Sequence, residues 1–359
     1  MVVSISHKGY IKRTPSSVYR AQRRGGKGLK GAETEDEDPI EHLFVASTHA
    51  YLLFFTNLGK VYWQKVYDLP ELKRDSRGRA IVNLLNLAEG EKIAECLAIR
   101  DLSTENLFLV MATRKGLIKK TPLEQYSRPK RGGIIAINLV DGDELVAAGL
   151  VGPADEIIMS SAKGQAVRFR QGTVRSSGRN AQGVRGIKLR SGDYVVGMVV
   201  ADPDSTLLTV CQNGYGKRTL IGPNSTAGDV AEDDSADEVA PPEVEATEGD
   251  EEAGDSSSNR YPTKGRGTMG VRDIKATERN GPVIAVASVK DADELLMMTA
   301  RGKIQRLRAA DISVIGRNTQ GVRIMSLDEG DTLVAVTRVP PEEEPEPQPP
   351  AEALPPPSP

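Results

Sequence analysis

Short apolar runs alternate with polar, glycine-containing turns along most of the chain, and one arrangement of them recurs. Each copy is an apolar run, a turn with a glycine, and a second run that carries basic residues. The copies are Ser4–Thr14, Leu53–Lys65, Val110–Thr121, Met159–Phe169, Thr209–Thr219 and Met297–Leu307, with turn glycines Gly9, Gly59, Gly116, Gly164, Gly214 and Gly302. Glycine supplies the positive φ that tight hairpin turns need. The pattern therefore predicts six β-hairpins.

The spacing of the turn glycines indicates a repeat of roughly 50 residues. Successive intervals are 50, 57, 48, 50 and 88 residues. The last interval falls close to the others once the 37-residue acidic stretch Pro223–Asn259 is left out, so we interpret this stretch as an insertion within the fifth repeat. It holds 13 acids, no base and no aromatic residue. A composition of this kind predicts disorder.

Further parts of the repeat also recur. The motif G-R-x-x-x-G-V-R stands at Gly178–Arg185, Gly265–Arg272 and Gly316–Arg323. With the apolar runs and Gly-Asp turns that follow the hairpins, each repeat is expected to form about four short strands. Six such units predict an all-β, radial, propeller-like array whose small sheets pack face to face. Alternating apolar residues such as Leu107, Leu109 and Met111 are expected to fill the core between sheets.

The charge is distributed unevenly. The whole chain has 47 basic and 50 acidic residues, a net charge of −3. Five of the acids lie in the proline-rich tail Pro340–Pro359, which has no base and is expected to be extended and mobile. Without this tail and the acidic insertion the rest of the chain, Met1–Val339, carries a net charge of +15. A basic body of this size indicates a polyanionic partner.

Basic residues recur at fixed positions after the turn glycines. We call them the hairpin cations: Lys12, Arg13, Lys119, Lys120, Arg168, Lys217, Arg218 and Arg306. The second copy has Trp63 instead. In a radial array, equivalent positions are expected to form a ring of positive charge around one rim. We count the arginines of the G-R-x-x-x-G-V-R motif with this rim: Arg179, Arg185, Arg266, Arg272, Arg317 and Arg323. The alternative is that these cations only protect strand edges in solvent.

A second concentration of charge lies in Arg20–Gly31, which has five bases, four glycines and no acid. Glycine lets a backbone approach a phosphate closely, and arginine and lysine neutralise it. Aromatic residues are few, whereas proteins that bind single strands usually stack bases on aromatic side chains. These features favour a duplex held by its phosphates and bent around the rim.

Several other classes of protein fit the sequence poorly. No apolar run reaches the roughly 18 residues of a membrane span, and no signal peptide is evident. Cys96 and Cys211 lie far apart and match no zinc or redox spacing, which favours an intracellular protein with reduced thiols. We find no catalytic constellation, no metal motif and no nucleotide-binding loop.

The residues resemble a known family. Gln22–Gly28 reads QRRGGKG, which resembles the complete gyrase A box, the signature of the C-terminal domain of the DNA gyrase A subunit. We call Gln22, Arg23, Arg24, Gly25, Gly26, Lys27 and Gly28 the box. Other sequences agree with that family: those of the repeated hairpins, VNLL at Val82–Leu85 and YPTK at Tyr261–Lys264. The acidic insertion and the proline-rich tail depart from its usual pattern.

The resemblance implies a six-bladed β-pinwheel that binds and wraps duplex DNA, with a box that joins the first and last blades and is needed for wrapping. It implies a non-catalytic domain without its own cofactor, monomeric when isolated. Such a domain works with the remainder of its own polypeptide and with the gyrase B protein in a cytoplasmic bacterial A2B2 topoisomerase, which uses ATP and Mg²⁺ elsewhere. The alternatives are the corresponding C-terminal domain of topoisomerase IV, which lacks an intact box, and a protein-binding β-propeller.

Overall fold

The computed structural model describes residues 1–6, 8–15, 40–73, 76–224, 259–301 and 303–339. The strands in these ranges are β1 (Val2–Ser6), β2 (Tyr10–Thr14), β3 (Ile40–Val45), β4 (Tyr51–Thr56), β5 (Lys60–Lys65), β6 (Arg79–Ala80), β7 (Ile93–Ile99), β8 (Phe108–Thr113), β9 (Leu117–Pro122), β10 (Ile134–Ile135), β11 (Leu145–Val151), β12 (Glu156–Ser161), β13 (Gln165–Arg170), β14 (Val184–Arg185), β15 (Val195–Val200), β16 (Thr206–Cys211), β17 (Tyr215–Leu220), β18 (Val271–Arg272), β19 (Val283–Val289), β20 (Glu294–Thr299), β21 (Ile304–Arg308), β22 (Val322–Arg323) and β23 (Leu333–Val339).

Short 3-10 helices follow several of the hairpins. They are η2 (Val66–Asp68), η3 (Ile81–Asn83), η4 (Leu123–Tyr126), η5 (Gln171–Thr173) and η7 (Ala309–Asp311). Within the described ranges, no helix is long and apolar enough to cross a membrane.

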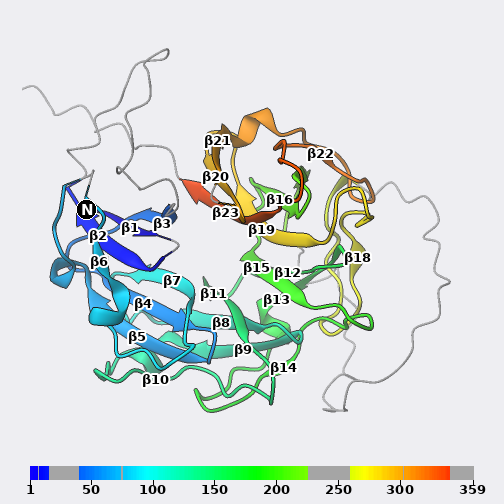
Figure 1. The fold of residues 1–359 in the computed structure, drawn as a ribbon. Coiled ribbons are helices and arrows are strands. Elements are labelled where there is room, and N and C mark those ends of the chain that lie inside the picture. Colours follow the sequence, from blue (N-terminus) through cyan, green and yellow to red (C-terminus); the bar gives the residue numbers. More distant parts are fainter. Residues whose placement is uncertain (7, 16–39, 74–75, 225–258, 302, 340–359) are drawn as a thin grey trace, which may run out of the picture.

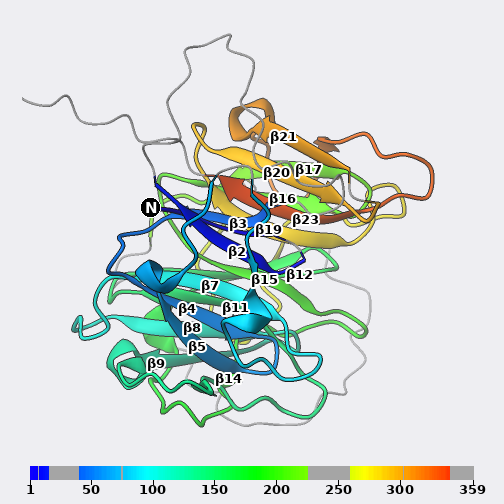
Figure 2. The ribbon, with the colours of Figure 1, turned by 60° about the vertical axis from the view of Figure 1, so that its left-hand side comes forward.

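The strands form six small antiparallel sheets, numbered blade 1 to blade 6 by the order of their hairpins. Five sheets have four strands and the last has three, β21-β20-β23. Figure 1 shows the blades following one another around a central axis, and Figure 2 shows the same arrangement after a turn about the vertical. One edge strand of each blade lies near the axis, where β7, β11, β15, β19 and β23 contact one another in turn and β23 also contacts β3. The predicted six-bladed, propeller-like fold is confirmed.

The outermost strand of a blade is supplied by the following repeat. Blade 1 has the order β3-β1-β2-β6, yet β6 comes after the β4–β5 hairpin of blade 2. The same exchange places β10 on β5, β14 on β9, β18 on β13 and β22 on β17. The pattern alone suggested that one sequence repeat forms one blade. In the structure the two differ, because each repeat after the first supplies the outermost strand of the preceding blade. Periodicity predicts where a strand lies, whereas a two-residue strand carries too little pattern to identify its partner.

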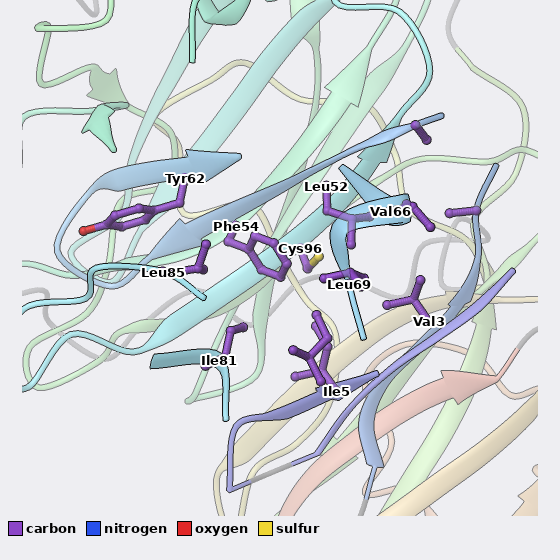
Figure 3. Close-up of a cluster of buried hydrophobic side chains, with 13 residues drawn as sticks. Val3, Ile5, Leu52, Phe54, Tyr62, Val66, Leu69, Ile81, Leu85 and Cys96 are labelled. Atoms are coloured by element: carbon purple, nitrogen blue, oxygen red, sulfur yellow. The ribbon is translucent and has the colours of Figure 1, made fainter. Parts of the chain in front are cut away.

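The hydrophobic core is divided among the interfaces between blades. Leu52 and Phe54 of β4 pack against Val3 and Ile5 of blade 1, as Figure 3 shows. The intervening residues of β4 point to the other face and pack against blade 3. Because successive side chains of a strand point to opposite faces, sheets buried on both sides need apolar residues at consecutive positions. The same holds in β8, where Leu109 and Met111 fill the core toward blade 2, as predicted.

The glycine turns are as expected where the structure describes them. Gly9, Gly59, Gly116, Gly164 and Gly214 have φ between 76° and 89°. A Cβ atom on Gly214 would also lie 2.3 Å from the carbonyl oxygen of Met325, so this turn needs glycine for space as well as for its dihedral angle. The sixth turn glycine, Gly302, lies outside the described residues.

Three sequence predictions concern segments that the structure does not describe. The box Gln22–Gly28 lies wholly outside the described residues, as do most of the acidic insertion Pro223–Asn259 and the whole tail Pro340–Pro359. The expected disorder and the joining of first and last blades therefore stay predictions.

Candidate nucleic-acid interface

The cations three positions after the turn glycines are buried within the disc that the six blades form. Lys12, Lys119 and Lys217 are 4%, 1% and 0% exposed. The Lys119 ammonium donates to the carbonyl oxygens of Ala136 and Arg179, both at 2.5 Å. The Lys217 ammonium donates to carbonyls of the corresponding two segments, those of Asp273 and Gly316, at 2.5 and 3.1 Å. Each lysine thus fixes the segments that flank the outermost strands.

Burial has an electrostatic cost for these lysines. Desolvation, together with the nearby Arg179 guanidinium, lowers the pKa of Lys119 from 10.5 to about 7. Burial also lowers the pKa of Lys217, although the Asp273 carboxylate, 3.3 Å away, opposes that shift. A cation held at such a cost is compensated by hydrogen bonds inside the protein.

The cations four positions after the turn glycines connect one blade to the next. The Arg13 guanidinium donates to the Leu69 carbonyl, just after η2 of blade 2, at 2.8 Å. Lys120 of blade 3 donates to Gln171 in η5 at 3.0 Å, and Arg218 of blade 5 donates to Ile312, just after η7, at 2.9 Å. These equivalent contacts cross the interfaces between blades 1 and 2, blades 3 and 4, and blades 5 and 6.

Arg168 makes the largest set of such contacts. Its Nε atom lies 2.6 Å from a carboxylate oxygen of Glu156, and both side chains are 1% exposed. Its Nη atoms donate to the carbonyls of Ile221, Tyr261, Gly222 and Pro223, and to the Asn224 side chain. Arg168 therefore holds the segment that directly follows β17, together with Tyr261.

These observations correct the predicted rim. The expectation that the hairpin cations project into solvent is wrong for Lys12, Lys119, Lys120, Arg168, Lys217 and Arg218, which are buried. Arg13 is partly buried, and only Arg306 is exposed, beside Glu294. Their recurrence reflects a repeated structural contact between blades. Trp63 takes the same position in blade 2 and packs in the core shared with blade 3.

The motif arginines divide into two groups with different environments. The first arginine of each motif donates to a backbone carbonyl on the outermost strand of the preceding blade: Arg179 to Ile135, Arg266 to Arg185 and Arg317 to Arg272. Arg317 is only 5% exposed. These arginines tie neighbouring outermost strands together along the circumference.

The second arginine of each motif is the exposed one. Arg185, Arg272 and Arg323 lie on β14, β18 and β22, the outermost strands of blades 3, 4 and 5. The segments next to these strands and next to β10, the outermost strand of blade 2, add exposed cations that sequence reasoning did not single out: Arg128, Lys130, Arg131, Lys188, Arg190, Lys264, Lys275 and Arg279. Their signal in the sequence was their position beside the G-V-R strands or, for Arg128, Lys130 and Arg131, beside Ile134–Ile135, and not a repeated register. The exposed positive charge thus follows the circumference of the disc.

The chemistry of the remaining side chains is limited. Among the described residues, no group of histidine, cysteine and acidic side chains could hold a metal ion. Cys96 and Cys211 are free and buried, and burial raises the pKa of the Cys211 thiol to about 12. What the surface offers is therefore a curved array of guanidinium and ammonium groups, suited to a chain of phosphates.

Comparison with known proteins agrees with this fold. The profile of the DNA gyrase C-terminal domain, beta-propeller family matches residues 1–47, 50–100, 108–151, 155–202, 257–290 and 293–340. The solved C-terminal domain of DNA topoisomerase IV has a similar fold, with a TM-score of 0.71 and 22% identity over 95% of this chain and 93% of that one. The solved DNA gyrase A C-terminal domain aligns with a TM-score of 0.67 and 28% identity over 94% and 98%.

Similar curated proteins are A subunits of DNA gyrase. The chain is 44% identical over 339 residues to the protein of Salmonella typhimurium and 42% identical to that of Escherichia coli K12. Each alignment covers 94% of this chain and 34% of the relative, so the chain spans about a third of the length of these proteins. On this evidence the chain belongs to the DNA gyrase C-terminal domain family, with its β-propeller fold.

Proposed function

We propose that this chain binds duplex DNA without sequence preference along its circumference and wraps it. The observation that carries the proposal is the series of exposed arginines Arg185, Arg272 and Arg323 on successive outermost strands. Cations spaced along a curved edge contact successive phosphates, and those contacts offset the cost of bending, about 1–6 kcal/mol for 40–90° over 20–30 bp.

In this proposal the domain has no catalytic step and no cofactor of its own. It serves an ATP-dependent type IIA topoisomerase in the bacterial cytoplasm, whose other parts are the remainder of the gyrase A polypeptide and the gyrase B protein. Wrapping around the disc would fix the handedness of the DNA crossing presented to the catalytic core, which gives the holoenzyme its direction toward negative supercoiling. The described residues contribute charge and curvature to this task.

The phosphate part of the proposal is tested by the salt dependence of duplex affinity. The logarithm of the association constant is expected to fall linearly with the logarithm of salt concentration, with a slope of about −0.9 for each phosphate contacted. Duplexes of unrelated sequence should give the same slope. A salt-independent affinity would refute phosphate binding, and a strong sequence preference would refute non-specific binding.

The box is a separate part of the proposal. Replacing Arg23, Arg24 and Lys27 with alanine is expected to abolish wrapping while leaving substantial binding by the other blades. The readouts are duplex affinity and the linking number of nicked circles ligated with the protein bound. Equal loss of both would mean that the box is one more phosphate contact.

A protein-binding propeller remains the second candidate function. The surface of the disc has exposed apolar side chains, such as Val82 on η3 and Tyr67 on η2, at 61% and 48% exposure. They are scattered among polar residues, however, and scattered exposure of this kind is normal for soluble proteins. The charge along the circumference favours DNA.

A further inference from the structure

Blade 5 departs from blades 3, 4 and 6 at the turn that precedes its strand near the axis. In blades 3, 4 and 6 this turn has a Gly-Asp pair, and the aspartate accepts a hydrogen bond from the hairpin turn. Asp143 accepts from the Lys115 amide, Asp193 from the Lys163 amide and Asp331 from the Arg301 amide, at 2.9, 2.9 and 3.2 Å.

The equivalent turn of blade 5 has no such acid. Gly281 is followed by Pro282, and the hairpin residue in the equivalent position is Asn213. The Asn213 amide donates to the Asn280 carbonyl at 3.0 Å, and its side chain donates to the carbonyls of Glu278 and Arg279. The carboxylate that recurs in blades 3, 4 and 6 is thus replaced in blade 5 by neutral contacts.

Two arginines converge on one hydroxyl at this place. Arg279, from the loop between β18 and β19, donates from Nε to the Tyr215 hydroxyl at 3.3 Å. Arg323, on β22, donates from an Nη atom to the same oxygen at 3.2 Å. Their guanidinium carbons lie 5.2 and 5.6 Å from the centre of the Tyr215 ring. Neither arginine forms an ion pair with a described residue.

The three groups are held in place by the backbone around them. Tyr215 is 7% exposed and pairs with Arg323 across β17 and β22. The buried Asn280 side chain accepts from the Thr277 amide and donates to the carbonyls of Lys275 and Gln320, which ties the Arg279 loop to the segment before β22. The two like charges are therefore brought together before any ligand arrives.

We propose that Arg279, Arg323 and the Tyr215 hydroxyl form a phosphate-binding site on blade 5, occupied by a backbone phosphate of the duplex. The two guanidinium groups neutralise the anion. The Tyr215 oxygen accepts from both arginines, which leaves its own proton available to a phosphate oxygen. Hydrogen bonds from Arg323 and Arg279 lower the pKa of Tyr215, in keeping with a positive potential at this hydroxyl. The choice of occupant rests on the proposed function.

The test uses the full chain with three variants, R279Q/R323Q, Y215F and the control K290Q/R308Q. The control removes two exposed cations that are each paired with a surface carboxylate, Asp202 and Asp311. The double arginine variant is expected to reduce the steepness of the salt dependence of duplex affinity by about 0.9, the value for one phosphate. Y215F should lower affinity at every salt concentration without changing the slope, because it removes a donor and no charge.

The outcomes separate the site from the wider function. If the wild type shows no salt-dependent affinity, the proposed function itself fails. If the wild type does, but R279Q/R323Q changes the slope no more than the control, this site is refuted and the function stands. Calorimetry with inorganic phosphate supplies another readout. If R279Q/R323Q loses phosphate binding but keeps the salt slope of duplex affinity, the site binds free phosphate, and the proposal that a duplex phosphate occupies it is refuted. Thermal unfolding confirms that all variants are folded.

Discussion

Arg168 distinguishes most sharply between a cation that holds blades together and one that contacts DNA. We predict that Arg168→Met destabilises the fold. Its partner Glu156 lies at 2.6 Å with both side chains 1% exposed. The substitution leaves this buried carboxylate with the Thr263 hydroxyl at 3.0 Å and the Arg170 guanidinium at 4.0 Å, and without its closest cation. It also removes the donor for the Ile221 and Tyr261 carbonyls.

The magnitude follows from the burial of the pair. Removing one partner of a buried ion pair costs about 3–5 kcal/mol, mostly because the remaining charge is uncompensated. The double variant Glu156→Gln/Arg168→Met should regain part of this loss, since a neutral amide is cheaper to bury than a lone carboxylate. The two substitutions should therefore be strongly non-additive.

The assay is urea unfolding of the wild type, both single variants and the double variant, with duplex affinity measured well below the unfolding transition. We expect a large loss of stability for Arg168→Met and little change in the salt slope of the folded protein. Unchanged stability together with a shallower salt slope would refute a structural role for Arg168 and would indicate that it contacts DNA.

The remaining predictions concern turns, titration and the circumference. Gly90 and Gly214 both have positive φ, but a Cβ atom would meet nothing within 4 Å at Gly90 and a carbonyl at 2.3 Å at Gly214. Both alanine variants should lose about 1–3 kcal/mol to backbone strain, and thermal unfolding should show a clearly larger loss for G214A. Because the folded chain releases the Lys119 proton near pH 7 and the unfolded chain near 10.5, the unfolded chain binds more protons between these values. The free energy of unfolding of the wild type relative to K119M should then rise with pH in this window, by at most about 1.4 kcal/mol per unit; a flat difference would mean that Lys119 keeps its charge. Finally, R185Q/R272Q should reduce the salt slope by about 1.8 if each arginine neutralises one phosphate, while unfolding in urea changes by less than about 0.5 kcal/mol per substitution.

The sequence predicted the elements of the fold better than their partners. Glycine turns and alternating apolar residues sufficed for six hairpins and for cores between sheets, because both depend on residues close together in the chain. The exchange of outermost strands was not predicted, since β6, β10, β14, β18 and β22 have only two residues each. Pairing over such distances depends on tertiary packing, which short patterns do not encode.

The candidate site shows where recurrence misleads. A cation at one register in most repeats, such as Lys119 or Arg218, indicates a repeated structural environment as readily as a shared ligand. The burial of the side chain decides between a structural contact and a shared ligand. A sequence pattern does not reveal that burial for lysine and arginine, because their long stems are apolar and their ends are charged. By contrast, Arg279 and Arg323 belong to a place where blade 5 departs from the repeat, and their convergence on Tyr215 became visible only in three dimensions.

The most direct test of the account is the ligation of nicked circular DNA with the full chain bound, followed by measurement of the linking number. Wrapping predicts a shift that grows with protein concentration, is reduced by R185Q/R272Q and is retained by the control K290Q/R308Q. Salt-dependent binding without any shift in linking number would contradict wrapping, and an equal loss in both variants would contradict the assignment of wrapping to the outermost strands.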